Sequence, residues 1–170
     1  MRLLGVDPGT RVAGFAVIDT DEHGIVPVEI GTIKLNTKVP VETRVFALGT
    51  RIERIISEHN PAMLAVERVF VHKSAMSALK LKMANAVAID RAMSAGIQHI
   101  EISPGQAKKA VTGNGGASKN RVRRAVQRIC RLEKPPQSDA ADALAIAICA
   151  AAKMKAKSDK IQAWITSSEA

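Results

Sequence analysis

The sequence has 170 residues, 46% of them hydrophobic, which is enough for one globular domain with its own core. No apolar run approaches the roughly 18 to 20 residues that span a bilayer, and the start of the chain lacks a signal-peptide pattern, so we expect a cytoplasmic protein with no membrane partner. With 25 Lys and Arg against 16 Asp and Glu, the net charge is +9, which favours an acidic partner, and nucleic acid rather than an anionic membrane.

The N-terminal part of the chain predicts a β-meander, followed by a helix and another strand. From Val41 to His59 the apolar positions recur with a period of about 3.6 residues, which predicts a helix. The run AMLAVE, which follows Pro61, predicts a short buried strand. The meander is expected from runs rich in β-branched residues between turn signals, at residues 2–7, 13–19 and 28–35.

The C-terminal part predicts three helices and one strand. Gly96 ends the first helix, Ser118 is a plausible N-cap of the second, and Pro135 and Pro136 precede the third. The alternation of strands and helices predicts a single α/β domain, built on one mixed sheet flanked by helices, over residues 1–153. Residues 154–170 have little apolar content and are expected to form a mobile basic tail. The helices are expected at residues 74–95, 119–132 and 138–154, and the strand at 96–103.

Two of the predicted strands end in an acid. LLGVD and MLAVE end in Asp7 and Glu67, whose carboxylates emerge at one edge of the sheet if the strands are parallel neighbours. Asp139 and Asp142 are three residues apart and project from one face of the last helix, near its start. Carboxylates brought together in this way must be neutralised by protons or by a cation. Oxygen ligands suit Mg²⁺ or Mn²⁺, and a pair of such ions catalyses phosphodiester hydrolysis, so the pattern predicts a nuclease.

Most of these acids also have a simpler interpretation when taken alone. An Asp before Pro-Gly, as at Asp7, is typical of a turn. Asp139 suits the positive end of a helix dipole, and Glu67 fits a local ion pair with Arg68. Asp142 is harder to explain in this way, because it interrupts an apolar stripe and a charge there needs a partner. The joint pattern, rather than any one acid, favours the metal site.

A run of basic residues with no acid among them follows the last predicted strand. A solvated helix face normally mixes both signs of charge, so this run predicts a surface that contacts phosphates, with binding that weakens steeply as salt rises. For any single Arg of the run, solvated surface is the simpler interpretation. The run consists of Lys108, Lys109, Lys119, Arg121, Arg123, Arg124, Arg128 and Arg131.

Aromatic residues make up only 2% of the chain, so each position is informative. Phe15 and Phe46 lie in periodic apolar segments and are expected in the core. Phe70 lies three residues after Glu67, in a segment that looks like a loop reaching a helix. There it suits stacking on an unpaired base.

Four separated motifs occur in order over residues 1–152: GVDPGT with GFAVID, AVERVF followed by SALKLK, VTGNGGASK, and SDAADALAIAI. In order and approximate spacing they resemble the motifs of the RuvC family of Holliday-junction resolvases. The resemblance implies a ribonuclease-H-like fold and a Mg²⁺-dependent endonuclease that nicks two strands of a four-way DNA junction symmetrically, in recombination and repair. It also implies a homodimer and suggests the RuvA–RuvB branch-migration complex as a partner.

The resemblance assigns roles to individual residues. The catalytic acids and metal ligands would be Asp7, Glu67, Asp139 and Asp142, which hold two Mg²⁺ ions, with Mn²⁺ as a substitute. Lys119 would assist catalysis near the scissile phosphate, together with Lys108, and Phe70 would act at the junction centre. The expected DNA contacts are Phe70, Lys73, Lys80, Lys108, Lys119 and Arg121.

The chain departs from the family pattern in segments that would contact DNA or the second subunit. These departures put the details of junction binding in doubt but leave the acids untouched. On the helix at 74–95, one apolar side is expected to be buried either in the core or in a dimer interface; it consists of Met76, Leu79, Met83 and Val87. The departures are Ser74, Lys82, Asn85, Ala86 and Gly116.

Three other functions remain open from the sequence. DPGTRVAG also resembles the phosphate loop of actin-like ATPases and sugar kinases, although such enzymes usually need about twice this length and give the basic run no role. A relative of the same fold that processes RNA is a second alternative, and a junction-binding protein that has lost catalysis is a third. The intact acids disfavour the third, and only the family resemblance favours DNA over RNA.

Overall fold

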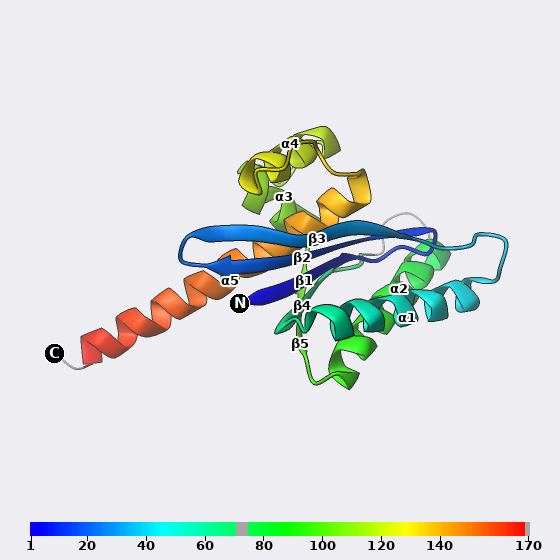
Figure 1. The fold of residues 1–170 in the computed structure, drawn as a ribbon, viewed down its shortest axis with the longest axis horizontal. Coiled ribbons are helices and arrows are strands. Elements are labelled where there is room, and N and C mark those ends of the chain that lie inside the picture. The colour runs from blue at the N-terminus through cyan, green and yellow to red at the C-terminus, as the bar shows by residue number, and fades with distance from the viewer. Residues whose placement is uncertain (71–74, 169–170) are drawn as a thin grey trace.

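A computed structural model describes residues 1–70 and 75–168, and its centre is a mixed sheet of five strands (Figure 1). The strand order is β3-β2-β1-β4-β5. The first three strands form the predicted antiparallel meander, whereas β1 pairs with β4, and β4 with β5, in parallel. The mixed sheet expected from the sequence is therefore confirmed. The strands are β1 (Arg2–Asp7), β2 (Val12–Asp21), β3 (Gly24–Lys34), β4 (Met63–Glu67) and β5 (Gln98–Ile102).

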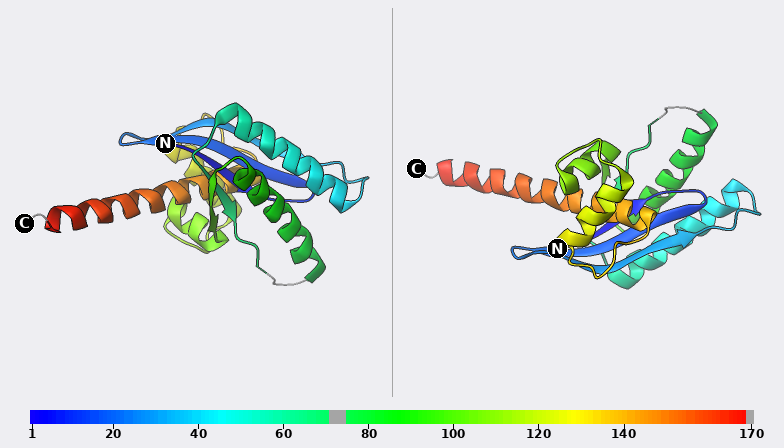
Figure 2. Two further views of the ribbon diagram at one scale, coloured as in Figure 1. Left: turned by 90° about the horizontal axis from the view of Figure 1, so that it is seen from below. Right: turned by 90° about the horizontal axis from the view of Figure 1, so that it is seen from above.

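Helices cover both faces of this sheet, as the views of Figure 2 show. Successive side chains of a strand point to opposite faces, so Leu3 of β1 packs with α3, α4 and α5, and Leu4 packs with α1 and α2. The helices are α1 (Val41–His59), α2 (Ala75–Ser94), α3 (Pro104–Thr112), α4 (Lys119–Ile129) and α5 (Ser138–Ser168). No helix in the described part of the chain is long and apolar enough to cross a membrane.

Two glycines let α5 lie directly against the sheet. A Cβ on Gly5 would be 2.4 Å from the carbonyl oxygen of Ala143, and a Cβ on Gly14 would be 1.9 Å from that of Asp139. Gly14 on β2 is the pairing partner of Asp7 on β1. The start of α5 is therefore held over the end of β1 by backbone contact.

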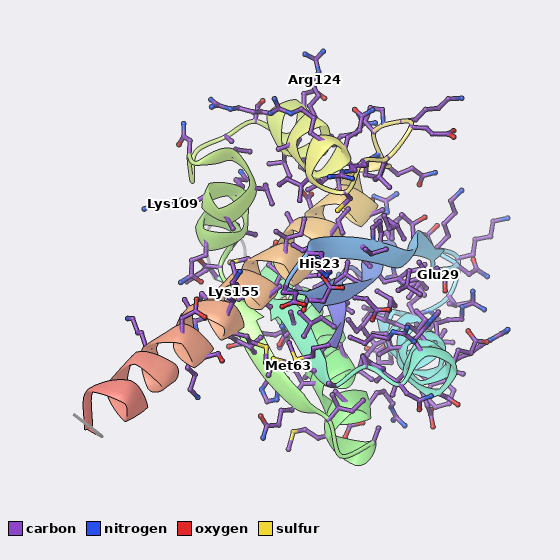
Figure 3. All side chains as sticks on the ribbon, turned by 60° about the vertical axis from the view of Figure 1, so that its left-hand side comes forward. His23, Glu29, Met63, Lys109, Arg124 and Lys155 are labelled. Atoms are coloured by element: carbon purple, nitrogen blue, oxygen red, sulfur yellow. The ribbon has the colours of Figure 1, made fainter. Side chains whose placement is uncertain are left out.

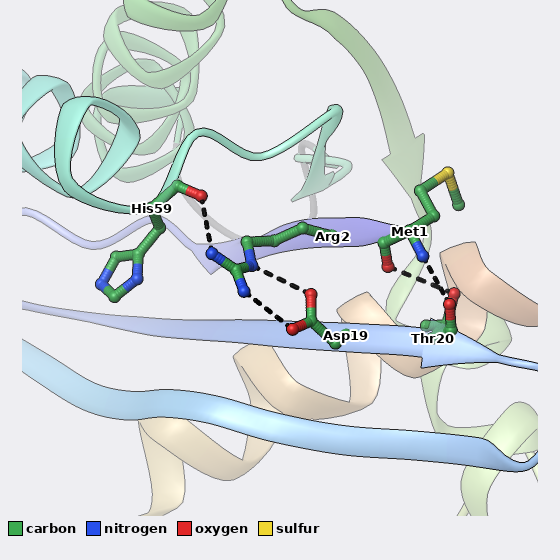
Figure 4. A network of polar contacts seen from close by, with 5 residues as sticks. All are labelled: Met1, Arg2, Asp19, Thr20 and His59. Atoms are coloured by element: carbon green, nitrogen blue, oxygen red, sulfur yellow. Dashed lines mark hydrogen bonds and ion pairs between the residues drawn. The ribbon is translucent and has the colours of Figure 1, made fainter.

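Polar contacts fix the opposite end of β1 (Figure 4). Arg2 donates two hydrogen bonds to the carboxylate of Asp19 on β2, at 2.9 and 2.8 Å, and a third at 3.1 Å to the carbonyl oxygen of His59. These contacts join β1, β2 and the last residue of α1. They hold the strand whose other end carries Asp7.

The last helix is longer than predicted. We expected it to end at Met154, but α5 continues to Ser168 and extends beyond the sheet (Figure 1). Residues 155–168 contain no Gly or Pro and include several good helix formers, so nothing in this segment ends the helix. The prediction of the helix end was wrong because low apolar content was taken as a sign of irregular structure. The division of the chain at residue 154 and the mobility of the tail stay predictions.

Of the two phenylalanines expected in the core, one is exposed. Phe15 is buried, with 7% of its surface exposed, but Phe46 on α1 is 71% exposed. The buried face of α1 includes Leu48 and Ile52. Phe46 is two positions before Leu48, so it lies about 200° around the helix axis from it and points away from that face. The expectation for Phe46 was therefore wrong.

The helix α3 was not predicted from the sequence. Ser103 accepts a hydrogen bond from the backbone N–H of Gln106, whose side chain in turn accepts one from the backbone N–H of Ser103. Together with Pro104 at the first helical position, this capping box is a helix-start signal that the sequence contains. The omission matters because α3 carries Lys108.

Candidate active site

The sheet brings the two strand-end acids to one edge. Asp7 is the last residue of β1 and Glu67 the last of β4, and the parallel register pairs Val6 with Val66. The first two turns of α5 add Asp139 and Asp142 at the same edge. One carboxylate oxygen each from Asp7, Asp139 and Asp142 lie within 4.8 Å of one another. The acids picked out from the sequence therefore converge in the fold.

Glu67 joins this group across a cleft of about 230 Å³. The cleft is lined by the carboxylates of Asp7, Glu67 and Asp142 and by two lysines, Lys108 and Lys119. Its apolar wall consists of Pro104, Ala107, Val122 and Ala145. The cleft therefore combines three carboxylates, two lysines and an apolar wall.

Burial and like charge act together on the acids. Burial, followed by the charges of Glu67, Asp142 and Asp139, raises the pKa of Asp7 from 3.8 to about 8, against the opposing effect of Lys119. Burial and the charge of Asp142 raise the pKa of Glu67. Burial also raises the pKa of Asp142, which Lys119 opposes. Such a cluster binds either protons or a cation.

None of the simpler interpretations accounts fully for the positions of Glu67, Asp7 and Asp139. Arg68 does not pair with Glu67; its guanidinium lies 3.8 Å from the carboxylate of Glu101 on β5. Asp7 ends a regular strand and lines the cleft, so it does more than shape the turn that follows. Asp139 does lie in the first turn of α5, as the dipole interpretation requires, and it also belongs to the oxygen cluster.

Two lysines come to the cleft from different helices. Lys119 is the first residue of α4, and its Nζ lies 3.7 Å from Oδ2 of Asp142. The helix start is fixed by Ser118, whose hydroxyl accepts a hydrogen bond from the backbone N–H of Arg121, as predicted for this N-cap. Lys108 lines the cleft from α3. Both lysine side chains therefore lie beside the acids of the cleft.

The other predicted DNA contacts among the described residues lie on different segments and do not line the cleft. Phe70 follows Glu67 and is 45% exposed, and Lys80 is exposed on α2. Arg121 lines a separate, larger hollow on α4 together with Arg124 and Arg128, and Figure 3 shows Arg124 pointing away from the sheet. Lys73 and the family departure at Ser74 lie outside the described residues.

The chain has a ribonuclease-H-like fold built on a mixed sheet. Its site consists of carboxylates at the ends of two adjacent strands and on the helix that crosses them. Residues 3–150 match the family described as Crossover junction endodeoxyribonuclease RuvC, and the chain belongs to that family. This confirms the resemblance seen in the sequence, and it removes the support for an actin-like ATPase or sugar kinase.

Individual relatives agree with this assignment. A crossover junction endodeoxyribonuclease RuvC of Protochlamydia amoebophila is 43% identical over 148 residues, which cover 86% of this chain and 88% of the relative. The structure of Thermus thermophilus RuvC has a TM-score of 0.81 and 29% identity, over 91% of this chain and 97% of that one. A second structure, T. thermophilus RuvC in complex with Holliday junction substrate, has a TM-score of 0.81 and 27% identity, over 91% of this chain and 96% of that one.

The raised pKa values predict how stability depends on pH. In metal-free buffer, native Asp7, with its pKa of about 8, keeps a proton that the unfolded chain releases near pH 4. The folded state then binds more protons than the unfolded state, so the free energy of unfolding falls as pH rises between these values. In Asp7→Asn the side chain no longer titrates, so the free energy of unfolding should fall less as pH rises. We therefore expect Asp7→Asn to be more stable than wild type at pH 8 by roughly 1 to 3 kcal/mol.

Urea unfolding in EDTA at pH 5.5 and pH 8 measures this difference. Glu22→Gln is the matched control, because it removes a carboxylate that is 86% exposed and distant from the cleft. An equal pH dependence in wild type and Asp7→Asn would contradict the raised pKa of Asp7.

Proposed function

We propose that the protein is a Mg²⁺-dependent endodeoxyribonuclease that resolves four-way Holliday junctions by paired, symmetric nicks during recombination and DNA repair. The observation that carries the proposal is the convergence of carboxylate oxygens from Asp7, Asp139 and Asp142 within 4.8 Å, in a chain of this family. A DNA substrate also fits the cytoplasmic location expected from the sequence.

The donor set fits hard divalent cations. It consists of carboxylate oxygens only, without His or Cys, which suits Mg²⁺ or Mn²⁺ and not zinc. We propose that Asp7, Glu67, Asp139 and Asp142 hold two such ions. The bound ions would supply the activation of water and the stabilisation of the leaving oxygen during in-line hydrolysis. The raised pKa values of three of these acids support the fit, because the site lacks enough positive charge of its own.

The chain itself would bind and orient the phosphodiester. Lys119 and Lys108 approach the cleft from α4 and α3, where their charge would attract the scissile phosphate and stabilise charge that develops on it. The wall of Pro104, Ala107, Val122 and Ala145 would keep bulk water away from the reacting group. Hydrolysis would leave 5′-phosphate and 3′-hydroxyl ends, which are directly ligatable.

Paired nicks on a junction with two-fold symmetry require two identical sites, and we propose an isologous homodimer. Of the apolar side chains on α2, Met76 is 61% exposed and Leu79 is 55% exposed, so core burial does not account for them. Their exposure supports α2 as part of the dimer interface. The proposal of the RuvA–RuvB complex as a further partner depends on family membership alone.

The direct test is cleavage of a labelled synthetic four-way junction, with duplex, single-stranded DNA and RNA as competing substrates, in Mg²⁺ or EDTA. Paired symmetric nicks on the junction alone, lost in EDTA, are the expected result. Cleavage of the RNA substrate in preference to the junction would favour an RNA-processing enzyme of the same fold. Tight junction binding without cutting in Mg²⁺ or Mn²⁺ would favour a binding protein.

Replacement of Lys119 tests the role of the chain's own charge. We expect Lys119→Gln to reduce single-turnover cleavage about 10²-fold, because a cation near the developing charge is lost, while junction affinity falls only a few-fold. Lys155→Gln is the matched control; it removes the same charge from the exposed part of α5, visible in Figure 3. Equal cleavage rates for the two variants would remove Lys119 from the mechanism.

A further inference from the structure

Asn85 is a fully buried polar residue on α2. It is 1% exposed, and no other polar or charged side chain in the described part of the chain is buried to this degree. It lies on the helix face that also carries Ala84 and Ala88, both of which are completely buried. Burying an amide in such apolar surroundings costs free energy unless hydrogen bonds replace those made with water.

The amide of Asn85 is used at the end of β4. Its Nδ2 donates a hydrogen bond of 2.8 Å to the backbone carbonyl of Glu67, the strand-end acid of the cleft. The next residue, Arg68, donates its backbone N–H to Ile102 of β5 at 2.8 Å. The peptide group that follows the Glu67 side chain is therefore held on both sides, by α2 and by β5.

The helix that carries Asn85 is itself closely packed. A Cβ on Gly49 of α1 would lie 2.8 Å from Cγ2 of Val87, so α1 and α2 approach closely just after Asn85. Lys82 and Arg68 also meet at Glu101, at 3.4 and 3.8 Å, which gives a second link between α2 and the end of β4. Exposed ion pairs of this kind contribute little, so the buried hydrogen bond of Asn85 is the stronger restraint.

We propose that Asn85 is a positioning residue: by fixing the backbone of Glu67 it sets the direction in which the Glu67 carboxylate enters the cleft. The proposal rests on the proposed function, in which Glu67 is a metal ligand. Partners that orient metal ligands typically contribute 10- to 100-fold to metal affinity or activity. The contact also joins the cleft to α2, the helix proposed for the dimer interface. Loss of Asn85 should weaken metal binding and the chemical step while leaving the affinity for the junction unchanged.

Two substitutions remove the hydrogen-bond donor in different ways. Asn85→Ala removes the side chain beyond Cβ, and Asn85→Leu keeps its approximate volume; neither side chain can donate to the carbonyl of Glu67. Ile55→Val serves as the stability control, because Ile55 is a buried residue of α1 that does not line the cleft. Three quantities are measured for each protein: Mn²⁺ affinity of the DNA-free protein by electron paramagnetic resonance, junction affinity in EDTA, and single-turnover cleavage at saturating protein.

We expect both Asn85 variants to bind Mn²⁺ about 10-fold more weakly and to cut about 10- to 100-fold more slowly, with junction affinity within about 2-fold of wild type. Ile55→Val should match wild type in all three. If wild type binds Mn²⁺ but cuts no junction, the proposed function fails, and the Mn²⁺ affinities still decide the role of Asn85. Folded Asn85 variants that bind Mn²⁺ as tightly as Ile55→Val would overturn the proposal.

Discussion

Asp7→Asn is expected to abolish junction cleavage, with a loss of at least about 10³-fold, and to leave junction binding intact. The substitution keeps the shape of the side chain but removes one negative charge from the oxygen cluster of Asp7, Asp139 and Asp142. Metal affinity depends on that charge. Attraction to polyanionic DNA does not, because in metal-free buffer below pH 8 Asp7 keeps its proton and the substitution changes no charge.

The measurement pairs single-turnover cleavage in Mg²⁺ with junction affinity in EDTA. Asp90→Asn is the matched control, since it makes the same chemical change on an exposed position of α2 that does not line the cleft. It should cut at the wild-type rate. A folded Asp7→Asn protein that loses junction affinity, or one that still cuts at a rate near wild type, would contradict the assignment of Asp7.

The acids could be found from the sequence because each depends on local pattern. A short apolar strand that ends in a carboxylate indicates where Asp7 and Glu67 emerge, and a spacing of three residues places Asp139 and Asp142 on one helix face. The parallel pairing of β1 with β4 had to be assumed, and so did the position of α5 over the end of β1; the structure has both.

Other features of the site depend on contacts between distant segments, which local patterns do not encode. Asn85 appeared in the sequence only as a departure from a family pattern, and its bond to the carbonyl of Glu67 depends on how α2 packs on β4. The exposure of Phe46 has a different origin, because its position about 200° around α1 from Leu48 follows from helix geometry and could have been read from the sequence.

Gly14 is the clearest of these distant contacts, and Gly14→Ala is expected to have the second large effect. The added Cβ would lie 1.9 Å from the carbonyl oxygen of Asp139 and 3.0 Å from the backbone nitrogen of Ala140. The obstacle is helix backbone, which cannot rotate away as a side chain can. The start of α5 must therefore move outward, and it carries Asp139 and Asp142 away from Asp7. A misplacement of about 1 Å in catalytic geometry can reduce a rate about 10²-fold.

We therefore expect Gly14→Ala to cut junctions at least about 10²-fold more slowly, to bind Mn²⁺ more weakly, and to lose about 1 to 3 kcal/mol of stability through overpacking. Gly105→Ala on α3 is the matched control, because nothing lies within 4 Å of its added Cβ and its activity should not change. Circular dichroism and urea unfolding establish that Gly14→Ala is folded under the assay conditions. A folded Gly14→Ala protein with wild-type cleavage and Mn²⁺ affinity would show that the acids do not depend on the close contact between β2 and α5.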